Sequence, residues 1–382
     1  MSIYYTNAVG LVTQIEKFGR EIAGNQYKNY FVIRRGDFAY NKSATIKDPE
    51  GFIALLESHE QAAVPNSIFT CFRLKNESNS PQFFKHLFST NIHGNWLRRF
   101  ITIGARANGS LNIDSNDLLS LPLGLPTSLE QRKIADCLSS IDDLIAGQAK
   151  KIEALKAHKK GLMQQLFPAE GETVPRLRFP EFRDATGWEQ RKLEDLAKRG
   201  SGHTPSKSNA EYYGGGVKWV SLADTSRLDN GLILDTAKEI SELGIKHSSA
   251  VLHPAGTVIL SRDAGVGKSA VTGCPMAVSQ HFIAWVCHPN KLYNWFLYYV
   301  LQNGKPLFER IATGSTIKTI GLPFFVELRI AVPSLYEQRR IADCLSSLDT
   351  LITTQSEKLE ALKAQKQGLM QGLFPSISEV EA

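Results

Sequence analysis

The sequence holds few cysteines, and their arrangement indicates neither a disulfide framework nor a metal site. There are five among 382 residues, an odd number at wide spacings, with no CxxC pair. Disulfide-stapled secreted folds and zinc modules both need closely patterned cysteines. The nine histidines likewise form no HxxxH or HxxEH pair. We therefore expect no metal centre, and no Ser/His/Asp or paired-carboxylate arrangement stands out as a catalytic site.

Long hydrophobic runs are also missing. No stretch approaches the length that spans a bilayer, and the N-terminus lacks a basic segment followed by an apolar one. We expect a soluble, cytoplasmic protein without a membrane partner. The formal net charge of +6 and the pI near 8.9 permit a polyanionic partner but do not require one.

What the sequence does contain is one long segment written twice. Residues 126–168 and 333–375 align without gaps, since 333 − 126 = 207 and 375 − 168 = 207. About two thirds of the aligned positions are identical. An ungapped internal repeat of this length is stronger evidence of the architecture than any short motif.

Both copies show the heptad period of a coiled coil, with apolar residues at alternating steps of four and three. No proline interrupts either run, and each closes at Leu-Phe-Pro, where proline ends a helix. Each helix is expected to be roughly 55 Å long. The predicted seam residues are Ile134, Leu138, Ile141, Ile145, Gln148, Ile152, Leu155, Lys159, Leu162 and Leu166, with their counterparts 207 residues later.

Two matching apolar stripes in one chain can bury each other, which predicts an intramolecular antiparallel coiled coil with a pseudo-twofold axis. The alternative is that each stripe forms part of an ordinary bundle core. Gln148 and Gln355 occupy the same seam position near the middle of each helix. A polar seam residue can fix register at a cost in stability; the alternative is a tolerated defect.

The rest of the chain predicts two globular segments with strands and helices, so the fold class is α+β. The expected organisation is a first domain over 1–125, the first long helix over 126–168, and a linker rich in proline and charge over 169–187. A second domain over 188–332, the second long helix over 333–375 and a tail over 376–382 follow. In the first domain, strands are predicted around 30–33 and 67–72 and a helix over 81–99; in the second, strands around 217–221 and 256–261 and a helix over 292–307.

The two globular segments correspond at coarse landmarks but differ in length. Gly36 precedes a strand much as Gly256 does. From Trp188 to Gly256 there are 68 positions (256 − 188), but from Met1 to Gly36 only 35 (36 − 1). The first segment lacks a counterpart of the opening VPRLRFPEF…WEQRKLEDL and of the glycine-rich loop after it. We expect either a chain that starts late or a shortened first domain.

The two repeats and the entry to the second globular segment resemble a known family. The paired EQRKIADCLSSID…KGLMQQLF and EQRRIADCLSSLD…QGLMQGLF, together with VPRLRFPEF and WEQRKL, are similar to the specificity (S) subunits of type I restriction–modification systems. Further agreement comes from residues 201–205 (SGHTP), Trp219-Val220, residues 240–244 (ISELG) and Gln280. The resemblance covers nearly the whole chain.

The resemblance implies a non-catalytic subunit with two target recognition domains, each reading half of a split sequence in double-stranded DNA. The repeats would form the coiled coil that fixes the spacing, and the separation would match about one and a half turns of B-DNA, one turn being roughly 34–36 Å. Two methyltransferase subunits using S-adenosylmethionine, and restriction subunits using ATP and magnesium, would be the partners. The chain itself would hold no cofactor. The alternative is a coiled-coil assembly protein that does not read DNA.

Candidate DNA-contacting residues are basic or amide side chains in loops near predicted strand ends, where they can meet phosphates or base edges. For each, an ordinary surface or structural role is the alternative. The candidates are Arg34, Arg35, Lys42 and Arg106 in the first domain, and Ser201, His203, Thr204, Lys207, Arg262, Lys268, Gln280 and His281 in the second. The run from Arg262 to Ser269 does not complete a P-loop, because position 262 is arginine where that motif needs glycine.

Overall fold

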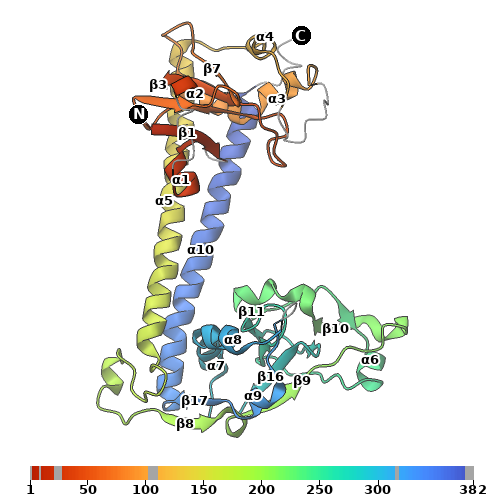
Figure 1. Cartoon of the computed structure of the whole chain (residues 1–382). Coiled ribbons are helices and arrows are strands. Elements are labelled where there is room, and N and C mark those ends of the chain that lie inside the picture. Colours follow the sequence, from red (N-terminus) through yellow and green to blue (C-terminus); the bar gives the residue numbers. More distant parts are fainter. Residues whose placement is uncertain (1, 8–9, 21–27, 102–110, 315–317, 375–382) are drawn as a thin grey trace. The chain divides into compact units, whose positions relative to one another are not determined.

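The computed structural model describes residues 2–7, 10–20, 28–101, 111–314 and 318–374, and the chain forms two compact units (Figure 1). The first unit comprises Met1–Lys150 and Ser356–Ala382, and the second comprises Lys151–Gln355. Two helices of 39 residues, α5 (Ser128–Leu166) and α10 (Leu335–Leu373), each contribute one part to both units. The chain is thus α+β with two long helices, which confirms the predicted fold class.

The two long helices begin in the same way because the repeat supplies the same signals. The Thr127 hydroxyl accepts a hydrogen bond from the backbone N–H of Glu130 (3.3 Å), and the Ser334 hydroxyl does so from Glu337 (3.3 Å). Such side chains satisfy backbone donors that a first helical turn leaves free. The repeat thereby sets where each helix starts.

Among its described residues the first unit has two small sheets and four short helices, and one sheet together with three of the helices packs on the start of α5 and the end of α10. The sheets have strand orders β2-β1-β6-β3 and β5-β4-β7. The core joins Phe38 and Leu97 to Leu138 of α5 and Phe374, just past α10. The elements are β1 (Ser2–Asn7), β2 (Gly10–Thr13), α1 (Gln14–Phe18), β3 (Phe31–Arg34), β4 (Phe38–Asn41), β5 (Phe52–Leu55), β6 (Gln61–Val64), β7 (Phe69–Phe72), α2 (Pro81–Ser89), α3 (Ile92–Leu97) and α4 (Ser115–Leu119).

In the second unit, a five-stranded sheet of order β11-β14-β13-β16-β9 is joined by a three-stranded one, β12-β10-β15, and by the pair β17-β8. The main core joins Trp285 and Phe296 to Leu166 of α5 and to Ile341 and Leu345 of α10. The elements are β8 (Glu189–Lys192), β9 (Ala197–Ser201), β10 (Tyr213–Val220), β11 (Leu232–Ile233), β12 (Glu239–Ile240), α6 (Glu242–Lys246), β13 (Val258–Ser261), β14 (Ser269–Thr272), β15 (Ala277–Val278), β16 (Phe282–Cys287), α7 (Asn294–Asn303), α8 (Lys305–Ile311), α9 (Leu322–Val326) and β17 (Arg329–Val332).

The globular parts share a central motif, as their landmarks predict. Gly36 (φ 91°) precedes β4, which lies between β5 and β7; Gly256 (φ 83°) precedes β13, which lies between β14 and β16. Two predicted helices are wrong as single elements. The helix over 81–99 is divided at Asn91, which is left-handed (φ 60°), and that over 292–307 is divided at Gly304.

The heptad seam is confirmed. Leu138, Ile152 and Leu166 of α5 are at most 4% exposed, and in α10 only Leu373, at 36%, reaches the surface among the predicted seam residues. Gln148 is 8% exposed and belongs to the first unit, whereas Gln355 is half-buried in the second. Their role in register stays a prediction.

A lysine at the same seam position in each helix reaches an aspartate of the other helix. In the first unit, Lys366 Nζ lies 2.6 and 2.8 Å from the two carboxylate oxygens of Asp142. In the second, Lys159 Nζ lies 2.5 Å from Asp349 Oδ1. These four residues are two repeat-equivalent pairs, and they place the start of one helix beside the end of the other. The helices are therefore antiparallel within each unit.

Each Lys–Asp pair is completed by a side chain from its globular part. The Tyr299 hydroxyl donates to Asp349 Oδ2 at 2.7 Å, and Lys159 Nζ lies 5.2 Å from the Tyr299 ring centroid. Burial, and then the Asp349 charge, raise the pKa of Tyr299. In the first unit, His86 Nδ1 lies 3.9 Å from Asp142 Oδ2, and its Nε2 lies 3.2 Å from Ser139 Oγ.

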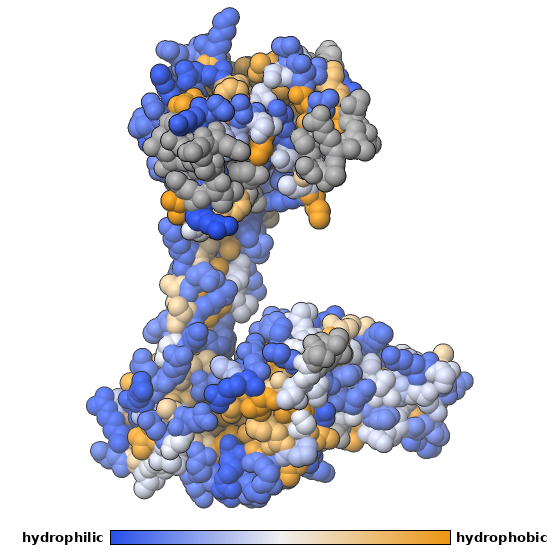
Figure 2. Space-filling view, in the orientation of Figure 1, coloured by the Kyte–Doolittle hydropathy of each residue, from blue (hydrophilic) through white to orange (hydrophobic). Residues whose placement is uncertain are grey.

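The surfaces of both units are mostly hydrophilic, with an apolar area over α7 and α8 of the second unit (Figure 2). Within the part of the chain that the structure describes, no helix is both long and apolar enough to cross a membrane.

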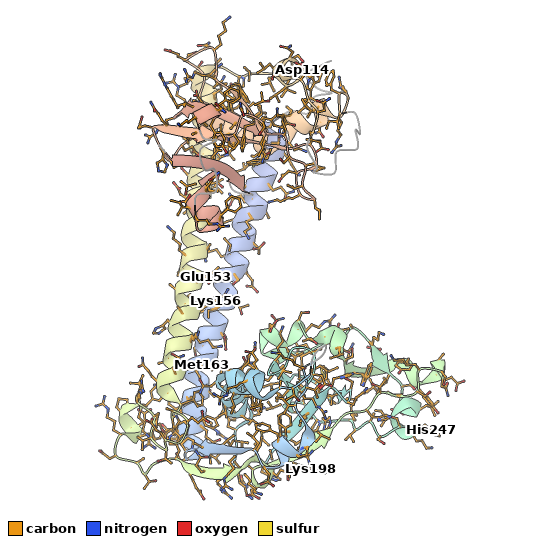
Figure 3. All side chains as sticks on the ribbon, viewed as in Figure 1. Asp114, Glu153, Lys156, Met163, Lys198 and His247 are labelled. Atoms are coloured by element: carbon orange, nitrogen blue, oxygen red, sulfur yellow. The ribbon has the colours of Figure 1, made fainter. Side chains whose placement is uncertain are left out.

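We expect Lys159→Ala to lower the free energy of unfolding of the second unit by about 1–2 kcal/mol, because Asp349 loses its ammonium partner in a partly buried setting. Lys156→Ala is the matched control. Lys156 lies one turn away, with its side chain 55% exposed beside Glu153 (Figure 3), and should cost no more than about 0.5 kcal/mol. Urea unfolding followed by tryptophan fluorescence measures both. Equal losses would contradict the prediction.

A second prediction concerns His86, which is 2% exposed. Burial, reinforced by the Lys366 ammonium, lowers its pKa to about 4. In the unfolded chain the pKa of this histidine is near 6.5, so the unfolded state takes up the proton first as the pH falls. The contribution of neutral His86 to the free energy of unfolding is therefore complete above about pH 6.5. It is lost as the pH falls towards 4, by up to about 3 kcal/mol.

His86→Gln should therefore flatten the pH dependence of the first unit. Hydrogen exchange of α2 at pH 7 and pH 5, corrected for intrinsic rates, measures this. His59→Gln is the control, since His59 is exposed. An unchanged pH dependence in His86→Gln would show that other groups cause it.

Candidate nucleic-acid interface

Three separate segments of the second unit meet beside its five-stranded sheet. They are the loop 202–208 after β9, the loop 262–268 between β13 and β14, and residues 279–281 between β15 and β16. The backbone N–H of His203 donates to the Val278 carbonyl (3.0 Å), and that of Arg262 donates to the His281 carbonyl (3.0 Å). The fold thus brings together loops that lie far apart in the sequence.

The first contact within this group joins Thr204 to Gln280. The Thr204 hydroxyl donates to Gln280 Oε1, and Trp219 Nε1 donates to the His203 carbonyl at 3.1 Å. Gln280 is exposed, so its amide nitrogen has access to solvent. The hydrogen bond orients the amide and leaves a donor on the surface.

The second contact joins His281, Asp263 and Arg262. His281 Nδ1 lies 2.6 Å from Asp263 Oδ2, and Arg262 Nε lies 3.6 Å from Asp263 Oδ1. Among the described residues, neither that Arg262 nitrogen nor that Asp263 oxygen has a hydrogen-bond partner, although both atoms are buried. Asp263 was not among the sequence candidates, because nothing in a loop carboxylate indicates that it will meet a histidine from another strand.

We call Thr204, Arg262, Asp263, Gln280 and His281 the loop cluster. It combines a guanidinium, an imidazole, an amide and a hydroxyl with one carboxylate, which lies beside the guanidinium and the imidazole. The first four groups form hydrogen bonds with base edges and phosphates. The loop cluster is thus chemically suited to a polar, anionic partner.

The other candidates of the second unit lie outside the loop cluster. Ser201 is in β9, where its backbone pairs with Ile283. Lys207 is exposed in the same loop as Thr204. Lys268 Nζ lies 2.6 Å from Asp229, and the residue lines a cavity of about 470 Å³ together with Lys305 and Lys318. Lys268 thus faces this cavity and not the loop cluster.

The first-unit candidates do not form one group. Arg34 is exposed at the end of β3, and Arg35 is paired with Glu60 at 3.2 Å. Lys42 is half-buried and lines a cavity of about 480 Å³ that also holds Asp37 and Arg73. Arg106 lies outside the described residues.

Asp37 and Arg73 form an ion pair that sequence reasoning missed. Arg73 Nη2 lies 2.8 Å from Asp37 Oδ2, and the backbone N–H of Arg34 donates to the same oxygen at 2.7 Å. Burial would raise the pKa of Asp37, but these hydrogen bonds outweigh it and lower the pKa overall. The charged pair therefore anchors β3 beside β7.

Residues 185–364 match the family described as "Type I restriction modification DNA specificity domain". The chain is 27% identical over 277 residues, 71% of its length, to the putative type I restriction enzyme MjaX specificity subunit of Methanocaldococcus jannaschii. It is 29% identical over 178 residues, 45% of its length, to the EcoR124I/EcoR124II specificity subunit of Escherichia coli. Residues 185–364 of this chain thus carry a type I restriction modification DNA specificity domain.

The sequence match covers only part of these relatives. The alignments span 62% and 43% of these curated relatives, so the chain matches less than two thirds of their length. The fold extends further. The S subunit of a type I system from M. genitalium has a TM-score of 0.55 at 16% identity, with 91% of this chain and 84% of that one covered. A second solved structure, whose description concerns complex assembly and conformational transition of the type I R-M system, has a TM-score of 0.58 at 20% identity. The match covers 89% of this chain and 81% of that one.

The fold also argues against the P-loop interpretation. A P-loop leads from a strand into a helix whose N-terminus holds phosphate. Here Lys268 precedes β14, which pairs antiparallel with β13. The glycines of this loop make a hairpin connection instead.

We expect Gly202→Ala to detach the loop 202–208 from β15. A methyl group at this position would overlap the carbonyl oxygens of Val278 and Ser279. Backbone atoms cannot yield as a flexible side chain can. Hydrogen exchange at residues 203–208 should speed up while circular dichroism stays unchanged. Gly161→Ala, which meets open space on α5, is the control, and unchanged protection in Gly202→Ala would refute the proposed packing.

Proposed function

We propose that this chain is the DNA-recognition subunit of a type I restriction–modification complex and that it reads a two-part target. The observation that carries the proposal is the loop cluster. Its members come from three loops of the domain that matches the specificity family. In this proposal each globular part reads one half of the target.

Within the loop cluster, Gln280 and Arg262 are the proposed readers of base edges. A glutamine amide can pair with adenine and an arginine with guanine. His281, oriented by Asp263, would donate or accept according to its tautomer. Lys207, exposed in the adjoining loop, would contact phosphate and add affinity without sequence preference.

The chemistry of modification and cleavage is assigned in this proposal to partner subunits. Two methyltransferase subunits would bind S-adenosylmethionine, and restriction subunits would use ATP and magnesium. This chain would then act by binding alone. The long helices would set the length of the unread spacer, since a rigid helix has a fixed rise per residue.

Recognition predicts distinct results for base-reading and phosphate-contacting variants. The chain would be co-expressed with the methyltransferase encoded beside it, and adenine methylation would be mapped across the genome. Binding of the complex to DNA that carries the methylated motif would then be measured at several salt concentrations. The wild type should methylate a split motif. Gln280→Ala should weaken binding by about 1–3 kcal/mol and relax one position, whereas Lys207→Ala should reduce the salt slope by about one and leave the motif unchanged.

The exposed Lys246→Ala on α6 serves as the control and should change neither quantity. A stable complex in which no variant of the loop cluster alters the motif would reject these residues as readers. Failure to bind DNA at all, with an intact methyltransferase complex, would favour the assembly-protein alternative.

A further inference from the structure

The second unit holds an extended arm that has no counterpart among the described residues of the first. The arm covers residues 172–192 and passes over the start of α10 before forming β8 beside β17 (Figure 1). Because the long helices are repeats, the α10 residues that contact the arm have equivalents in α5, 207 residues earlier.

Glu337 is the anchor of the arm. Arg178 donates to both of its carboxylate oxygens at 2.7 Å, and Trp188 Nε1 lies 3.3 Å from one of them. The Glu337 residue is 1% exposed. Hydrogen bonding to this carboxylate is the main reason that the pKa of Arg178 is raised. A buried, bidentate ion pair of this kind depends on both partners being present.

Apolar and backbone contacts hold the rest of the arm. Trp188 packs on Phe167 and Phe296, with ring centroids 6.0 and 5.7 Å away. Phe182 packs on Tyr336 at 5.3 Å. The strand β8 pairs with all four residues of β17. The arm thus covers a carboxylate and a strand edge, and it contacts the Tyr336 ring, which stays 68% exposed.

The first unit repeats this receiving surface but leaves it open. Glu130, the equivalent of Glu337, is exposed. Leu125 is 44% exposed, whereas its equivalent Val332 is 7% exposed; Leu129 and its equivalent Tyr336 are exposed alike, at 62% and 68%. Residues 122–125, equivalent to β17, form no strand. We call these residues, 122–125 with Leu129 and Glu130, the open site.

The contacts between the globular part and the long helices beside the open site match those beside the arm in the second unit. Gln131 and Gln338 are equivalent. The side-chain oxygen of Gln131 accepts from the backbone N–H of Ser80 at 3.1 Å, and that of Gln338 accepts from the backbone N–H of Tyr293 at 2.9 Å. Each glutamine also donates to the carbonyl of the proline that precedes its helix. Phe374 packs on Phe83 at 5.4 Å, as its equivalent Phe167 packs on Phe296 at 5.7 Å. The globular part is therefore seated in the same way in both units.

We propose that the open site binds an extended arm of a partner polypeptide with the chemistry of residues 172–192. That arm carries an arginine for Glu130, an aromatic residue about ten positions later, and a strand to pair with residues 122–125. Charge complementarity and the filled equivalent in the second unit identify this occupant. This chain's own arm is already engaged on Glu337. The inference does not depend on DNA recognition.

The test uses the full chain and a fluorescent synthetic peptide with the sequence of residues 172–193. Fluorescence anisotropy should show saturable binding of one peptide per chain. Glu130→Arg should weaken it by at least about tenfold, because the arginine of the peptide then meets a like charge. A peptide carrying Arg178→Glu should bind the wild type weakly and regain affinity for Glu130→Arg.

Glu153→Arg is the matched control, since Glu153 is an exposed glutamate of the same helix, and it should bind like the wild type. Absence of binding would overturn the proposal. Binding that Glu130→Arg leaves unchanged would also overturn it, because the peptide would then be displacing the arm of the second unit. Chain dimers in sedimentation that Glu130→Arg dissociates would identify a second copy as the occupant instead of a partner.

Discussion

The structure depends on a lysine that sits in an apolar helical seam and is neutralised across it. In each unit this lysine meets an aspartate of the other long helix, and the two pairs are repeat-equivalent. A seam lysine without its aspartate would leave a charge in a partly buried place. Shifting the helices by one heptad would separate both pairs at once. Register is therefore fixed by charge as well as by apolar packing.

The Lys–Asp pairs also link the repeated helices to globular parts that differ. Tyr299 completes one pair and His86 approaches the other, so an identical helical surface accepts different side chains. The strands β4 and β13 hold equivalent central places in their sheets. Such an arrangement lets the loops vary while the support stays constant.

The two units differ most at the ends of the repeats that receive the arm. In the second unit, Arg178 and Trp188 bury Glu337 and close the edge of β17. In the first, the equivalent carboxylate, that of Glu130, is exposed. A duplicated sequence thus has two different energetic environments. The difference arises from the segment that covers the helix and not from the helix itself.

The sequence by itself determined the long helices, their antiparallel pairing and the α+β class, because a strict heptad repeated twice has few ways to bury its stripes. It also indicated Thr204, Gln280, Arg262 and His281, but not that they would meet. Only the tertiary structure decided that, since β9, β13 and β16 become neighbours through long-range pairing that no local pattern encodes. The same holds for Asp263, for the aspartate partners of the seam lysines, and for Lys268, whose ammonium turns to Asp229. Side-chain partners are set by packing across the fold, whereas periodicity is a property of the chain.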